Sequence, residues 1–295
     1  MKQRLLLLLK GMAMGGADII PGVSGGTIAF ITGIYEELIH SIKSVDANAI
    51  ALLFSFRFKE FWEKVNGPFL ITLVLGILIS AFSLVQLLSH LLENYPIQLW
   101  SFFFGLILVS AILVARQVRT WSVKEVVAGL IGIIVAFLIT QGTASETPDD
   151  LWFIYICGAI AICAMILPGI SGSFILVLLG KYEYIINAIK DFNIGVLVVF
   201  ALGCITGIAA FSRLVSWLLA RYHSMTISLL AGFMLGSLNK IWPWKEVQSE
   251  NNILPNVYQS QGTDPYLAEA LLFFAVGVLL VILIEKLAHS LKETK

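Results

Sequence analysis

The sequence Ile20-Pro21-Gly22-Val23-Ser24-Gly25-Gly26 interrupts an apolar stretch in which a helix would otherwise continue. Proline lacks a backbone N–H and clashes with the preceding helical turn, and glycine allows backbone angles that other residues avoid. Serine is a good N-cap residue, so a new helix can begin at Ser24. The stretch therefore predicts a helix, a break and a second helix, whose free N–H groups and positive dipole end point back into the break.

A second copy of this arrangement occurs at Leu167-Pro168-Gly169-Ile170-Ser171-Gly172-Ser173. Residues 17–43 align with residues 164–190, and each copy continues into a Gly-x-Tyr-Glu sequence, at 33–36 and at 180–183. With gaps, the similarity extends further, through the pairs Gly76/Gly203, Tyr95/Tyr222 and Gly105/Gly232. The chain is therefore predicted to contain two repeats, 1–145 and 146–295, with the acidic segment 142–150 at their junction.

The composition is that of a membrane protein. The chain has 295 residues, of which 58% are hydrophobic and only 13% are charged, and its mean hydropathy is +0.90. A soluble protein has roughly a quarter of its residues charged. Because the 19 basic residues balance the 19 acidic ones, the charge gives no indication of a nucleic-acid partner. The expected surroundings are a lipid bilayer, and the fold class is an all-α polytopic membrane protein.

Each repeat is predicted to hold a re-entrant helical hairpin, broken at its Pro-Gly sequence, and three transmembrane helices. In the first repeat the hairpin covers 5–43 and the spans cover 69–92, 99–115 and 126–140. Between them, 44–66 mixes aromatic and charged residues, which favours a segment lying on the membrane surface. In the second repeat the hairpin covers 151–190 and the spans cover 194–219, 226–241 and 266–284.

The number of crossings predicts the relative orientation of the repeats. Each repeat crosses the membrane an odd number of times, so the two repeats are expected to be inverted, as in many transporters. The positive-inside rule agrees with this topology, since most lysines and arginines fall on the side of the N-terminus. The outer segments hold Lys190, Lys240 and Lys245, with Lys181 nearby. Both termini are therefore predicted to be cytoplasmic.

Two inverted breaks would meet near the middle of the membrane and form a site for an anion. Broken backbone is tolerated at this depth where it is buried in protein or lines a wet cavity, and helix N-termini there offer N–H donors to a phosphate or carboxylate. The alternative is that the small residues only allow close helix packing. The predicted phosphate-binding residues are Ser24, Gly25, Gly26, Thr27, Ser171, Gly172 and Ser173, and the predicted hinges are Pro21, Gly22, Pro168 and Gly169.

Asp18 precedes the first break by less than one helical turn and should lie deep in the membrane, where a carboxylate is costly and usually functional. Two interpretations stay open, namely coupling to a proton or cation and capping of the nearby N–H groups. The second repeat carries Met165 at this position. Glu36 and Glu183 are weaker candidates for ion coupling, since each lies about 18 Å along a helix beyond its serine, which favours an interfacial position.

Arg213 is an arginine well inside a long apolar run. It can hold a lipid phosphate from the cytoplasmic side, or its side chain can extend toward the cytoplasmic edge of the membrane.

The paired Pro-Gly-[Val/Ile]-Ser-Gly breaks, each followed by Gly-x-Tyr-Glu, resemble those of the polyprenyl-phosphate transporter family of bacteria and archaea. The resemblance implies a flippase that returns undecaprenyl phosphate from the outer to the inner leaflet of the cytoplasmic membrane for reuse in cell-envelope polymer synthesis. The family motif maps to Pro21, Gly22, Ser24, Gly25 and Gly26, and to Pro168, Gly169, Ser171 and Gly172. The second copy departs from the first with Ser173 for Gly26 and Phe174 for Thr27.

The sequence features also bear on two other classes of function. A channel or exchanger for a small inorganic anion could use the same helix ends, and the sequence hardly separates it from a flippase. An enzyme such as a lipid phosphatase is disfavoured, because the 4 histidines form no recognisable catalytic motif. Since the sequence contains no Walker motif, transport driven by ATP bound to this chain is not expected. The 3 cysteines show no metal-ligand spacing, so neither a metal nor a cofactor is expected. The coupling ion, H+ or Na+, and the formation of a homo-oligomer are left open.

Overall fold

The computed structural model describes residues 2–20, 23–143, 147–246 and 251–293, and within them it contains helices α1 to α16 and no β-strand. The first half consists of α1 (Lys2–Ile19), α2 (Gly25–Ile31), α3 (Tyr35–Lys43), α4 (Ala47–Phe54), α5 (Phe58–Lys64), α6 (Gly67–Ser83), α7 (Val85–Asn94), α8 (Pro96–Ala115) and α9 (Val123–Gln141). The second half consists of α10 (Leu151–Ile166), α11 (Gly172–Leu178), α12 (Tyr182–Lys190), α13 (Ile194–Arg221), α14 (His223–Ser237), α15 (Pro255–Ser260) and α16 (Leu267–Glu293).

Several helices are long and apolar enough to cross a bilayer. Four described helices pass this test, namely α8, α9, α13 and the part of α16 from Leu267 to Lys286. Two further pairs pass it together although they are bent, α5 with α6 by 71° and α11 with α12 by 108°. The chain is therefore an all-α, multi-pass membrane protein.

Four predicted helices differ in the structure. The second arm of each hairpin bends at a glycine with positive φ, Gly33 (70°) and Gly180 (62°), because glycine adopts this conformation without steric conflict. The apolar run 69–92 is divided into α6 and α7 at Leu84. The predicted span 226–241 is the 15-residue helix α14, which ends at Ser237. Since α14 packs against α8 and α9, it does not have to match the thickness of the lipid.

The two halves of the chain contain similar helix contacts. In the first half α1 packs along α6, where a β-carbon on Gly11 would clash with the carbonyl oxygen of Leu73. In the second half α10 packs along α13, where Gly158 approaches the carbonyl oxygen of Phe200 in the same way. These glycines bring the helix backbones into direct contact, as small residues do in membrane proteins.

The later helices of the two halves are exchanged. Helix α8 of the first half packs on α16 of the second, with Gly105 against Phe274, and α14 of the second half packs on α9 of the first, with Gly232 against Gly129. Each half therefore completes its packing with a helix from the other.

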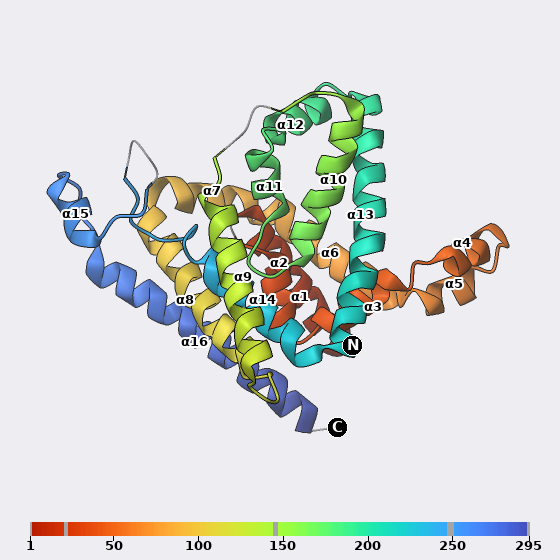
Figure 1. The fold of residues 1–295 in the computed structure, drawn as a ribbon, viewed down its shortest axis with the longest axis horizontal. Coiled ribbons are helices and arrows are strands. Elements are labelled where there is room, and N and C mark those ends of the chain that lie inside the picture. Colours follow the sequence, from red (N-terminus) through yellow and green to blue (C-terminus); the bar gives the residue numbers. More distant parts are fainter. Residues whose placement is uncertain (1, 21–22, 144–146, 247–250, 294–295) are drawn as a thin grey trace.

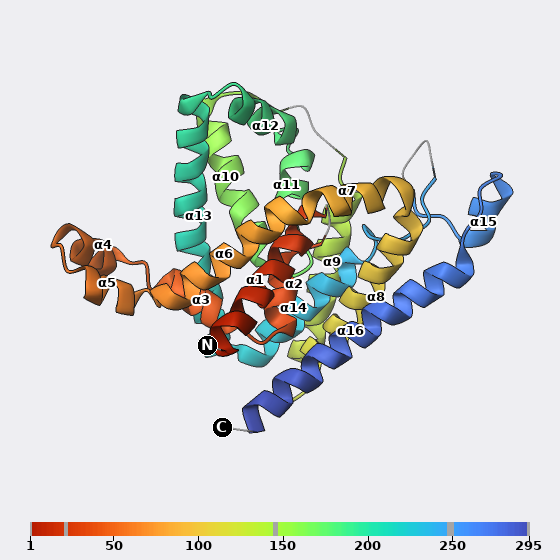
Figure 2. The ribbon, with the colours of Figure 1, turned by 180° about the vertical axis from the view of Figure 1, so that it is seen from behind.

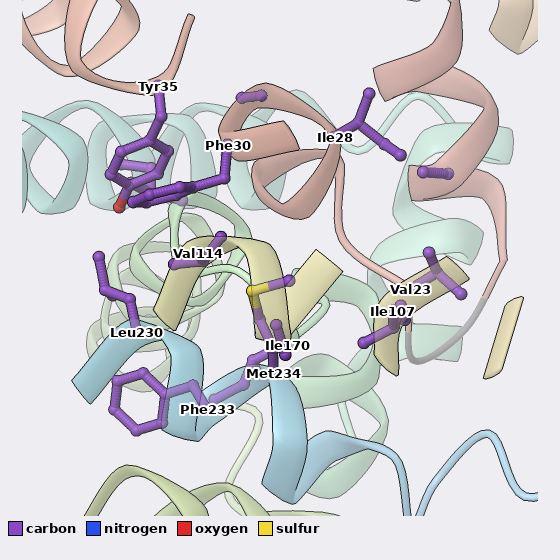
Figure 3. Close-up of a cluster of buried hydrophobic side chains, with 14 of the residues drawn as sticks. Val23, Ile28, Phe30, Tyr35, Ile107, Val114, Ile170, Leu230, Phe233 and Met234 are labelled. Atoms are coloured by element: carbon purple, nitrogen blue, oxygen red, sulfur yellow. The ribbon is translucent and has the colours of Figure 1, made fainter. Parts of the chain in front are cut away.

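Figures 1 and 2 show how these pairs are arranged, with α10 and α13 on one flank, α8 and α16 on the other, and α1, α2 and α14 between them. A large buried cluster fills this centre and includes a residue next to each break, Val23 and Ile170, together with Ile107 of α8 and Met234 of α14 (Figure 3).

The segment predicted to lie on the membrane surface forms α4 and α5, which project away from the other helices (Figure 1). This lobe exposes large aromatic side chains, at Phe54, Phe56, Phe58 and Trp62. Its placement at the membrane surface stays a prediction.

The close packing of α1 on α6 predicts that Gly76→Ala destabilises the protein. A β-carbon at this position would clash with the carbonyl oxygen of Leu8, so we expect a loss of about 1–3 kcal/mol, as for other overpacked sites. The melting temperature of the purified protein in detergent measures this. Gly195→Ala on α13 is the control, because its β-carbon would lie 3.7 Å from Asn193 Oδ1, an ordinary contact. Equal melting temperatures for the two variants would contradict the packing argument.

Candidate functional site

The two helix breaks meet in the structure. Ser24 Oγ lies within hydrogen-bonding distance of the carbonyl oxygens of Leu167 (3.1 Å) and Met165 (3.3 Å). Thr27 Oγ1 accepts a hydrogen bond from the backbone N–H of Gly169 at 3.0 Å. The hydroxyl groups of the first break therefore satisfy the backbone of the second, and both side chains are completely buried.

Glycines allow this close approach. A β-carbon on Gly26 would lie 2.7 Å from the carbonyl oxygen of Ile166, so a larger residue would push the two breaks apart. Gly169 has φ of 92° and packs against the last turn of α14, where a β-carbon would lie 2.9 Å from Ser237 Oγ. The predicted hinges Pro21 and Gly22 lie outside the described residues.

At the first break the N–H groups of α2 are already bonded within the same half. Ser24 is the N-cap and accepts from the backbone N–H of Gly26 at 3.1 Å. Asp18 Oδ1 accepts from the backbone N–H of Gly25 at 2.7 Å. This geometry fits the capping interpretation of Asp18, since a carboxylate is stabilised at the positive end of a helix.

The same helix, α1, also holds the other end of α2. Lys10 Nζ donates to the carbonyl oxygen of Thr32, the C-cap of α2, at 2.7 Å. Asp18 and Lys10 lie about 12 Å apart along α1, which matches the length of α2. A carboxylate at the N-terminal end and an ammonium at the C-terminal end both complement the helix dipole. Sequence reasoning did not identify this role of Lys10.

The second break lacks these charges. Met165 and Cys157 occupy the positions of Asp18 and Lys10. Ser171 is the N-cap of α11 but makes no capping bond, and its Oγ lies 2.7 Å from Ser173 Oγ. None of the described residues accepts a hydrogen bond from the backbone N–H groups of Gly172 and Ser173. The two breaks are therefore not equivalent, and in the described part of the chain the N–H groups at the start of α11 have no acceptor whereas those at the start of α2 do.

The other predicted residues lie apart from the breaks. Glu36 is exposed and its Oε1 lies 3.2 Å from His223 Nε2, a pair between the halves that sequence reasoning did not foresee. Glu183 is exposed on α12. Arg213 is exposed on α13 and donates to the carbonyl oxygen of Ala209 in its own helix at 2.6 Å.

A second lysine, Lys181, has a buried side chain. Its placement near the outer segments stays a prediction. Its Nζ donates to the carbonyl oxygen of Thr147 (2.7 Å) and to Asp149 Oδ1 (2.5 Å). Lys181 thus ties the segment that joins the two halves to the bend after α11.

Comparison with known proteins matches residues 14–255 to a family described as undecaprenyl phosphate translocase-like. The chain is similar to a polyprenyl-phosphate transporter of Vibrio cholerae serotype O1, with 43% identity over 296 residues that cover 96% of each chain. It is also similar to a polyprenyl-phosphate transporter of Staphylococcus aureus, with 34% identity over 254 residues that cover 80% of this chain and 85% of that relative. No solved structure matches the chain.

The contact between the breaks predicts that Thr27→Val destabilises the protein. Valine has a similar shape but leaves the buried N–H of Gly169 without an acceptor, which should cost about 1–3 kcal/mol. Chemical or thermal unfolding in detergent measures the loss. Thr72→Val is the matched control, because the Thr72 hydroxyl donates only to the Pro68 carbonyl of its own helix, and we expect a change within about 0.5 kcal/mol. A similar loss in both variants would argue against the contact.

The difference between the halves predicts a second stability effect. Asp18→Met gives the first half the residue of the second and removes an acceptor from the start of α2, so we expect a loss of about 0.5–2 kcal/mol. Met165→Leu at the equivalent position keeps volume and polarity and serves as the control. If melting temperatures show that Asp18→Met is no less stable than Met165→Leu, Asp18 does not cap α2.

Proposed function

We propose, since the chain belongs to the undecaprenyl phosphate translocase-like family of transporters, that it moves a polyprenyl phosphate across the membrane that it spans. The observation that carries the proposal is the direct contact between the two broken helices. In a membrane, broken backbone occurs where it is buried in protein or lines a cavity, and in transporters such breaks form the substrate site. A lipid that carries one phosphate suits a site of N–H and hydroxyl donors within apolar helices.

The proposed direction is from the outer to the inner leaflet of the cytoplasmic membrane, which returns undecaprenyl phosphate for cell-envelope synthesis. Support for this orientation comes from the lysines and arginines, most of which lie in segments on the side of both termini.

The proposed mechanism is a rocking of two inverted repeats around the breaks. The equivalent glycine contacts in the two halves support an internal repeat. The breaks are closed to solvent, with exposed fractions of 0% for Ser24 and Thr27 and 4% for Ser171. Access for a phosphate therefore requires the halves to separate, and the few hydrogen bonds between the breaks are the contacts that would open.

The phosphate would bind between the two breaks, facing Ser24, Gly25, Gly26 and Thr27 on one side and Ser171, Gly172 and Ser173 on the other. We place most of its charge at the second break. At the first break the carboxylate of Asp18 already accepts the hydrogen bond of the Gly25 N–H. At the second break the N–H groups of Gly172 and Ser173 have no acceptor among the described residues. The Ser171 and Ser173 hydroxyls would add hydrogen bonds to a charged group, which are the stronger kind.

Coupling to H+ or Na+ is proposed to involve Asp18, because neutralising its carboxylate would weaken the bond to Gly25 and loosen α2. Arg213, on the expected cytoplasmic half of α13, would contact the phosphate as it leaves. Glu36 and Glu183 are exposed at the ends of the hairpins and are assigned an interfacial role.

Leaflet exchange of undecaprenyl phosphate in proteoliposomes tests the proposal. We expect wild-type protein to exchange the lipid, and Ser171→Ala/Ser173→Ala to exchange it at least about 10-fold more slowly, since hydrogen bonds to a charged group contribute about 1.5–3 kcal/mol. Ser212→Ala is the control, because this buried serine donates within α13.

Exchange by the wild type no faster than in empty liposomes, together with rapid chloride or phosphate flux, would replace the flippase by a small-anion channel or exchanger. Equal exchange by the double variant and the control would move the phosphate site away from the second break.

A further inference from the structure

We propose that Lys240 receives the phosphate group of the lipid on its way to the second break and so determines the affinity for the charged headgroup. This inference rests on the proposed function and adds a residue that the sequence motif does not contain.

Lys240 lies directly beside the second break. It follows the last turn of α14, where its backbone N–H donates to the carbonyl oxygen of Ser237 at 2.9 Å. That same turn packs against Gly169, whose β-carbon, if present, would lie 2.9 Å from Ser237 Oγ. Lys240 is thus one turn away from the backbone of the break.

The ammonium group of Lys240 is held over the helix that begins at the break. Its Nζ lies 4.7 Å from the ring centroid of Phe174 in α11, a distance at which a cation is attracted to the face of the ring. Phe174 follows Ser173 and is 5% exposed. The positive charge therefore lies against a buried side chain of α11, the helix that begins at the second break.

Phe174 is also the position at which the two copies of the motif differ. The first copy has Thr27, whose hydroxyl bonds to the opposite break. The second copy has an aromatic ring instead, and this ring carries a cation. The departure from the motif thus replaces a hydroxyl by a positive charge on the half that keeps its N–H donors free.

The surrounding loop fixes Lys240 in place. Asn252 Nδ2 donates to the carbonyl oxygen of Asn239 at 2.7 Å, and Trp242 Nε1 donates to the carbonyl oxygen of Ile253 at 2.8 Å. Lys245 Nζ donates to the carbonyl oxygen of Lys240 itself at 2.8 Å, which brings a second ammonium group close. A side chain positioned by its supporting residues is what a binding site requires.

The charges around the breaks need such a cation. Asp18 places one carboxylate at the first break, and a phosphate monoester adds a charge of about −1.5 to −2 at pH 7. Two anions in a medium of low dielectric constant repel each other strongly unless a cation lies nearby. Lys240 is on the expected outer side, from which the phosphate arrives.

The test compares Lys240→Met, Lys240→Arg and the control Lys190→Met in proteoliposomes, with initial exchange rates measured over a range of undecaprenyl phosphate concentrations. Lys190 is an exposed lysine in another outer segment. We expect Lys240→Met to raise KM at least about 10-fold, since a charge-assisted hydrogen bond is lost. Lys240→Arg should stay within about 3-fold of wild type, and Lys190→Met within about 2-fold.

Melting temperatures of all variants control for folding. Phe174→Leu provides a second readout that does not touch the lysine: it removes the ring beneath the ammonium group, and KM should rise here too. If a folded Lys240→Met or Phe174→Leu variant has the same KM as the Lys190→Met control, the role of Lys240 is overturned. Exchange by the wild type would still support the flippase in that case. Absence of exchange in the wild type would instead overturn the proposed function, and the role of Lys240 with it.

Discussion

The structure depends on the hydrogen bonds between its two broken helices. A break leaves backbone N–H and carbonyl groups without helical partners, and at membrane depth no bulk water replaces them. Here the side chains of Ser24 and Thr27 approach the backbone of residues 165–169 in the other half. The second break is thus bonded by side chains of the first half, and the exchanged packing of α8 on α16 and of α14 on α9 also joins the halves. The halves are therefore bound together at the breaks, where the proposed mechanism would require them to separate.

Two copies of one motif have produced two different half-sites. The difference arises from a few positions outside the shared Pro-Gly-x-Ser-Gly sequence. Asp18 and Lys10 hold α2 at both of its ends, whereas Met165 and Cys157 leave α11 without such charges. A carboxylate that caps a helix accepts from the donors that an anion would otherwise use. This difference is the reason that we propose the second break as the main phosphate site.

The sequence predicted the features that depend on local chemistry. Proline and glycine predicted both breaks, and the low fraction of charged residues predicted a membrane protein. The repeated spacing predicted that the two breaks are equivalent. Prediction was less accurate where a helix could equally continue or bend. The Gly-x-Tyr-Glu sequences were recognised as motifs, but the bends at Gly33 and Gly180 were not predicted, because a glycine allows a positive φ without requiring it. Leu84, where α6 gives way to α7, carries no local signal of a break.

The sequence by itself determined that this chain is a helical membrane protein with two broken hairpins, because hydropathy and backbone restrictions act on neighbouring residues. Only the tertiary structure decided which charges meet. The pairing of Lys10 with the end of α2, of Glu36 with His223 and of Lys240 with Phe174 joins residues far apart in the chain. Electrostatic interactions act over a few ångströms in space whatever the separation in sequence, so the partner of a charge follows from the packing of the helices and not from its neighbours.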